Sequence, residues 1–143
     1  KMAVKESIDI VANQRAQFAY KCVKNVVEKE SKDVAQKYKS YSKRIMAMVR
    51  INSLLATITF IKSNISNKTD GKAYGQLYKD MENWLKSKEC PVNFAYKEEK
   101  GELLEVLVSL NSDHYRIITK EIMEFVNWIR RFAEGMIRDE SSA

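Results

Sequence analysis

The sequence predicts an all-α fold, a compact single-domain bundle of about five to six helices over residues 1–143. Two observations support this prediction. Only four glycines and one proline occur in 143 residues, so the turns that join the strands of a sheet would be hard to build. Apolar residues recur every three or four positions through most of the chain, which is the period of a helix with one buried face. The length suits one domain with one hydrophobic core.

The first two helices are separated by a short polar break. Residues 5–30 form the first predicted helix, and small alanines on its apolar face would let another helix approach closely. Its apolar positions are Ile8, Val11, Ala12, Ala16, Ala19, Val23 and Val26. Ser31, Lys32 and Asp33 interrupt this pattern, and a second helix is expected over residues 34–48.

The third and fourth helices lie on either side of a polar turn. A bend is expected just ahead of a nearly apolar helix over residues 53–63, which Asn52 or Ser53 can cap. The β-branched residues of this helix would also suit a strand. We prefer a helix, because no second strand pattern exists for it to pair with. Residues 64–71 are typical of a turn, and a helix follows over residues 72–86.

The last helix has the clearest pattern in the chain. A loop over residues 87–100 and a short helix over residues 102–110 precede it, and Asn111 or Ser112 can cap it. Its apolar residues step by three and four positions, so they must pack along another helix. These residues are Tyr115, Ile118, Ile122, Phe125, Ile129, Phe132 and Met136. On the opposite face, Lys120 and Glu124, and likewise Arg130 and Glu134, are four positions apart and can form local ion pairs.

The positive charge of the chain is concentrated in one segment. The net charge is +6, yet no Asp or Glu occurs in residues 34–69, which we call the acid-free segment. Its seven bases account for all of the excess charge, because the rest of the chain holds 18 bases and 19 acids; the seven are Lys37, Lys39, Lys43, Arg44, Arg50, Lys62 and Lys68. Tyr38 and Tyr41 lie among them and could stack on nucleobases or on sugar faces. The segment can be a solvated helix face, or it can present a purely positive surface to an anionic partner. Because it contains no acids, we favour the two interpretations equally.

The sequence offers little catalytic chemistry. His114 is the only histidine, and a lone histidine near a helix start is more often a surface or cap residue than a catalyst. No glycine-rich phosphate loop, nucleophile elbow or metal-ligand spacing occurs. Cys22 and Cys90 do not make a disulfide framework, and no apolar run is long enough for a membrane span. We therefore expect a cytoplasmic protein without enzyme activity, cofactor or metal.

Four strings, in this order, resemble one protein family. They are Arg-Ala-Gln-Phe-Ala at residues 15–19, Tyr-Lys-Ser-Tyr-Ser-Lys-Arg at 38–44, the apolar helix at 51–61 and Asn-Trp-Ile-Arg-Arg-Phe-Ala-Glu-Gly at 127–135. Together they resemble the small helical subunit of the type III-B CRISPR effector, the Cmr complex. The last string is the most specific. The chain departs from the family pattern at Ser53, where the family often has glycine.

The resemblance implies a subunit for antiviral defence that does not cut RNA itself. It would stack with copies of itself beside the backbone and large Cmr subunits, and would stabilise guide RNA and target RNA, away from any membrane. Sequence-independent contacts to phosphates by Lys and Arg suit a complex that reads sequence by base pairing. The RNA-facing candidates are Lys39, Lys43, Arg44 and Arg50, followed by Arg15, Arg116, Lys120 and Arg131.

Three hypotheses for function follow. The first is a structural subunit that contacts RNA, based on the acid-free segment and on the resemblance. The second is a helical adaptor whose basic face binds an acidic protein surface without RNA contact. The third is a ribonuclease that uses His114 together with a lysine.

Overall fold

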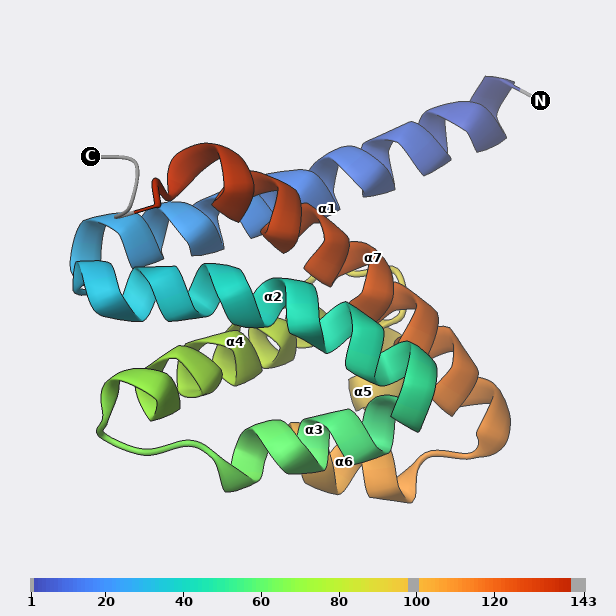
Figure 1. Cartoon of the computed structure of the whole chain (residues 1–143). Coiled ribbons are helices and arrows are strands. Elements are labelled where there is room, and N and C mark those ends of the chain that lie inside the picture. Colours follow the sequence, from blue (N-terminus) through green and yellow to red (C-terminus); the bar gives the residue numbers. More distant parts are fainter. Residues whose placement is uncertain (1, 98–100, 140–143) are drawn as a thin grey trace.

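The computed structural model describes residues 2–97 and 101–139, with side chains over residues 12–96 and 101–139. Within those ranges the chain forms seven helices and no strand (Figure 1). The helices are α1 (Met2–Lys29), α2 (Lys32–Asn52), α3 (Leu54–Ser63), α4 (Thr69–Lys86), α5 (Asn93–Lys97), α6 (Leu103–Ser109) and α7 (Ser112–Met136). The all-α prediction is confirmed, whereas the predicted number of five to six helices was too low.

Two elements differ from the prediction. The expected loop after α4 contains the short helix α5, whose Ala95 and Tyr96 are buried in the core. Five residues are too few to show a helical period, so the sequence pattern missed this helix. α2 continues to Asn52, beyond the expected end at residue 48, and the chain turns at Ser53 instead.

The turn between α2 and α3 depends on Ser53. Its φ of 91° lies in the left-handed region, which usually favours glycine. The residue also caps α3, because its hydroxyl accepts the N–H of Ala56 at 3.3 Å and its carbonyl accepts the hydroxyl of Thr57 at 2.8 Å. These hydrogen bonds offset the backbone strain, and the residues that follow form the predicted helix rather than a strand.

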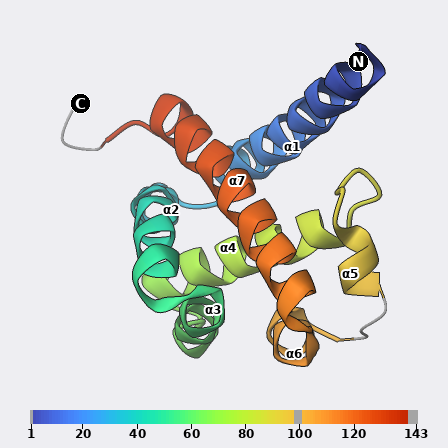
Figure 2. The same ribbon diagram turned by 90° about the vertical axis from the view of Figure 1, so that its right-hand side faces the viewer.

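The core is organised around α7, which crosses the molecule between α1 and α2 with α4 behind it (Figure 2). The predicted apolar stripe of this helix is buried along its centre, with Ile118, Ile122, Phe125 and Ile129 at most 1% exposed. The stripe faces three helices rather than one, because α1, α2 and α4 all pack on α7. Packing against these three helices therefore fixes the position of α7 and of the side chains on its solvent-exposed side.

α1 enters the bundle with its second half, while its first turns extend beyond the other helices (Figures 1 and 2). Ala19, Val23 and Val26 are fully buried, as predicted for its apolar face. Ile8 and Val11 of that face lie outside the residues whose side chains are described. None of the described helices combines the length and the apolar character that a membrane crossing requires.

Candidate nucleic-acid interface

The bases of α2 diverge onto two flanks of the helix. Lys39, Lys43 and Arg50 are spaced so that they share one side, and Lys43 pairs there with Glu134 of α7. The other side carries Lys37 and Arg44 and faces α4 instead. The acid-free segment therefore does not present its charge in one direction.

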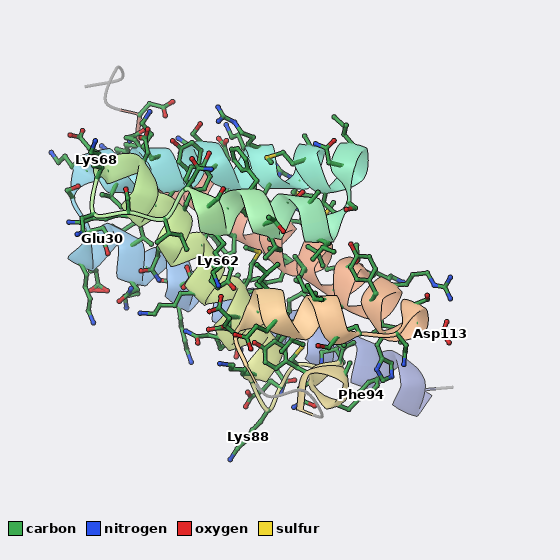
Figure 3. The ribbon with its side chains drawn as sticks, turned by 90° about the horizontal axis from the view of Figure 1, so that it is seen from below. Glu30, Lys62, Lys68, Lys88, Phe94 and Asp113 are labelled. Atoms are coloured by element: carbon green, nitrogen blue, oxygen red, sulfur yellow. The ribbon has the colours of Figure 1, made fainter. Side chains whose placement is uncertain are left out.

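Acids from other parts of the chain meet this segment. Four of its seven bases form ion pairs, which are Lys37–Asp70, Lys39–Asp139, Lys43–Glu134 and Lys62–Glu102. The last pair joins α3 to the residue ahead of α6, on the side of the molecule seen in Figure 3. Hydrogen bonds from the lysines lower the pKa of Glu102, Glu134 and Asp139, so these carboxylates stay ionised at neutral pH. The one-signed field inferred from the missing acids is thus largely neutralised by the fold.

Lys39 and the two tyrosines of α2 serve the interior. Lys39 is 7% exposed, and its ammonium donates to the carbonyl of Ile137 and to Asp139, both at 2.9 Å. It thereby ties the residues after α7 to α2. Tyr38 is fully buried and donates to Asp80 at 2.7 Å, while Tyr41 stacks on a tyrosine of α4. The expectation that these tyrosines stack on nucleobases was wrong, because α2 turns both toward the core.

Arg15 is also an interior residue. Its guanidinium donates to both oxygens of Glu121, at 2.5 and 2.7 Å, and to Glu124 at 3.2 Å. The indole N–H of Trp84 donates to the same Glu121 at 2.9 Å, so α1, α4 and α7 meet at one buried carboxylate. The hydrogen bonds that it donates to Glu121 raise the pKa of Arg15, so the guanidinium stays charged. Arg15 is only 8% exposed and therefore positions α7 from the interior of the bundle.

The exposed candidates come together on the outward side of α7. Arg116, Lys120 and Arg131 are spaced by whole turns and lie on the side away from the core. Arg130 lies on the flank toward α2, where its guanidinium donates to Asn127 at 2.9 Å. We use "the α7 face" for these side chains together with the two α2 bases on the same flank, which gives Lys43, Arg50, Arg116, Lys120, Arg130 and Arg131.

Two acids of α7, Glu124 and Glu134, form different ion pairs from the local ones that the sequence suggested. Glu124 pairs with Arg15, and Glu134 pairs with Lys43 of α2, so neither of the suggested local pairs forms. Among the residues that the structure describes, Arg50, Lys120, Arg130 and Arg131 form no ion pair. Sequence reasoning missed Arg130, because it assigned the local acid Glu134 to it. The α7 face therefore keeps positive charge that the acid-free segment loses.

The remaining candidates lie elsewhere or are paired. Arg44 sits over the ring of Tyr41, 5.3 Å from its centroid, on the flank of α2 that faces α4. Arg116 is on the α7 face but pairs with Asp113 at 2.5 Å, and both side chains are largely exposed. An exposed pair of this kind is worth little and exchanges readily for a phosphate.

His114 is placed as a structural residue at the start of α7. Its backbone N–H donates to Asn111 at 2.8 Å, which confirms the predicted cap. Its ring meets the ring of Phe94 edge-on at 5.4 Å, at the end of the molecule where Figure 3 labels Phe94 and Asp113. Within the described ranges, no hydrogen bond or ion pair joins this ring to a lysine or an acid. The part of the chain with described side chains also brings together no cluster of metal-ligating residues.

One comparison with known proteins bears on this geometry. A family model described as "CRISPR-associated protein (Cas_Cmr5)" matches residues 11–136. The match includes the acid-free segment, Arg15 and the whole of α7, and so covers both the buried carboxylate junction and the α7 face.

Proposed function

The chain belongs to the Cmr5 family, the small subunit of the type III-B CRISPR complex, and from this premise we propose that its α7 face lies along the RNA of the assembled complex. In this proposal the subunit performs no catalysis. It neutralises phosphates of the guide–target hybrid and so stabilises the assembly in antiviral defence.

The observation that carries the proposal is the surplus of positive charge on the α7 face. Arg50, Lys120, Arg130 and Arg131 project from two helices without an acid within ion-pair distance in the described part of the chain. Helix α7 holds three of these side chains on a rigid body, because the Arg15–Glu121 junction and the core fix it from behind. Rigid placement lowers the entropy lost when the charges engage a phosphate chain.

The structure changes which of the residues predicted from the sequence we expect to contact RNA. We propose that Arg50, Lys120 and Arg131 contact phosphates, with Arg130 added to them. Lys43 and Arg116 would exchange their exposed carboxylate partners for phosphates. The residues left outside the proposed interface are Arg15 and Lys39, which are buried, and Arg44, which lies on the other flank.

Salt-dependent binding of target RNA by the reconstituted complex tests the proposal. A variant with Arg50, Lys120, Arg130 and Arg131 replaced by Gln should bind more weakly and with a smaller dependence on salt. The expected reduction in the slope of log affinity against log salt is about 0.7 for each single-strand phosphate contact removed. The matched control neutralises four exposed lysines away from this face, which are Lys68, Lys72, Lys79 and Lys88. Equal effects of the two variants would contradict the proposal, because net charge alone would then explain binding.

The adaptor hypothesis keeps one supporting observation. Ile51 is 79% exposed at the end of α2, and Val108 is 66% exposed on α6. Such side chains suit contacts with other Cmr subunits or with a stacked copy of the chain. If the four-residue variant lost its place in the complex while RNA affinity per assembled complex stayed constant, the adaptor function would replace RNA contact.

A further inference from the structure

A second aromatic cluster lies at the surface between α7 and α1. The rings of Trp128 and Phe132 stack at 5.6 Å with 25° between their planes, and Tyr20 of α1 meets Phe132 edge-on at 5.6 Å. The guanidinium of Arg131 lies over the indole of Trp128, 5.1 Å from its centroid. We call these four side chains the Trp128 platform.

The platform is open to solvent. Tyr20 is 42% exposed, Arg131 is exposed, and the two α7 rings are only partly buried. Every buried polar side-chain atom of the described residues has a hydrogen-bond partner, and the indole N–H of Trp128 has none among them. This N–H therefore faces water, unlike that of Trp84, which is buried and donates to Glu121. Core packing covers these rings only in part, and the exposed guanidinium of Arg131 lies over the indole of Trp128.

The charge around the platform is positive. Arg131 forms part of it, and Lys24 lies one turn beyond Tyr20 on α1. The nearest acid on this side of α7, one turn before Trp128, is Glu124, which pairs with Arg15. Stacked rings with an arginine plane and cationic flanks complement a polyanion with flat apolar groups.

We propose that the Trp128 platform stacks an unpaired base of single-stranded RNA. The inference rests on the proposed function for the presence of RNA at the α7 face, and it adds a contact to a base where that function needs phosphates alone. Arg131 would serve both, with its plane against the base and its charge near the adjacent phosphate. Stacking accepts every base, so the contact adds affinity without reading sequence.

Binding of short RNA by the purified full-length chain tests this. The probe is a 12-nucleotide oligoadenylate, compared at low salt with an RNA of equal length in which the central bases are replaced by abasic ribose. The abasic strand keeps its phosphates, so it should bind roughly five- to a hundred-fold more weakly, the range expected for loss of one base–aromatic stack. Trp128→Ala should cause a similar loss with the oligoadenylate and little further loss with the abasic strand. Trp128→Phe keeps a ring and should keep most of the affinity.

Tryptophan fluorescence gives a second readout. Oligoadenylate should quench the emission of the wild type, and Trp128→Phe should remove the quenching, because the remaining Trp84 is 0% exposed. Circular dichroism of each variant shows whether the helices are intact.

The outcomes separate this inference from the proposed function. Equal affinity for the two strands, absence of Trp128 quenching or absence of RNA binding by the chain would overturn the platform as a base site. The salt-dependent effect of the four-residue variant in the complex would survive each of these results. If Trp128→Ala removed the subunit from the complex and left RNA binding unchanged, the platform would bind a protein instead.

Discussion

The two tryptophans of this chain sit in clusters built from similar parts. Trp84 stacks on Phe125 at 5.7 Å in the core, with the Arg15–Glu121 pair beside it. Trp128 stacks on Phe132 at the surface, with Arg131 over its ring. The difference between them is the carboxylate, which accompanies the arginine inside and not outside.

This difference follows from the cost of burying charge. A guanidinium removed from water needs a paired and hydrogen-bonded anion, and Glu121 provides both to Arg15. Arg131 stays hydrated and needs no such partner, so its charge is available to another molecule. The interior cluster is therefore expected to contribute to stability and the surface cluster to binding.

Matched truncation of the two tryptophans should show the largest contrast. Trp84→Ala should cost about 3–5 kcal/mol of the free energy of unfolding, because a fully buried ring leaves a cavity and Glu121 loses a hydrogen bond. Trp128→Ala should cost less, about 1–2 kcal/mol, since its ring is only partly buried against the core. Urea denaturation followed by circular dichroism measures both. Comparable losses would remove the distinction between the two clusters.

The two arginines give the next contrast. Arg15→Leu should lose about 3 kcal/mol, because Glu121 would remain buried without its cation. Arg131→Leu should change stability by no more than about 0.5 kcal/mol, because its side chain is exposed and forms no ion pair with the described residues. The double variant Arg15→Leu, Glu121→Leu should recover part of the loss if the unpaired carboxylate is its cause. No recovery would indicate a packing defect instead.

Asp80 is a buried carboxylate without a paired cation among the described residues, so its ionisation should destabilise the fold, whereas ionised Glu121 is stabilised by Arg15. Burial raises the pKa of Asp80 to about 6, against stabilising hydrogen bonds from Tyr38 and Gln76. The thiol of Cys22 on α1 also hydrogen-bonds to it, and the charge of the exposed neighbour Lys79 lowers its pKa slightly. The folded state then binds more protons than the unfolded state between about pH 4 and 6, so the contribution of Asp80 to stability falls as pH rises through this window and stays constant above it.

Asp80→Asn isolates that effect. The amide can satisfy Tyr38 and a reoriented Gln76 without carrying charge, so the variant should exceed wild type by up to about 2 kcal/mol at pH 8. The difference should disappear near pH 4. Denaturation curves at both pH values measure it, with Asp139→Asn as a surface control that should show no gain. A variant less stable than wild type at pH 8 would mean that ionised Asp80 holds the helices together.

The helices could be predicted from the sequence more fully than the interface. Apolar periodicity revealed six of the seven helices found in the described ranges. Residue type narrowed two caps to Asn52 or Ser53 and to Asn111 or Ser112, and the structure uses Ser53 and Asn111. The five residues of α5 are too few for such a period. The departure at Ser53, where the family often has glycine, agrees with its φ of 91°.

The interface depended on contacts between distant parts of the chain. The acids that neutralise Lys37 and Lys43 lie 33 and 91 residues away, at Asp70 and Glu134, so a window of sequence could not reveal them. The local pairs suggested on α7 were likewise overridden, since Glu124 pairs with Arg15. Periodicity did place Lys120 and Arg131 correctly on the outward side of the last helix.

The smallest effect on stability is expected at Glu134, the acid that would compete with RNA for Lys43 on the α7 face. Glu134 pairs with Lys43, and both side chains are about half exposed, so Glu134→Gln should change stability by less than about 0.5 kcal/mol. The same change frees Lys43 for a phosphate and should raise RNA affinity at low salt roughly two- to five-fold. Glu89→Gln removes the same charge from an exposed site after α4 and is the matched control. If both variants raised affinity equally, net charge would explain the gain. A gain confined to Glu134→Gln would show that the carboxylate on α7 holds Lys43 until RNA replaces it, which distinguishes this exposed pair from the buried pair of Arg15.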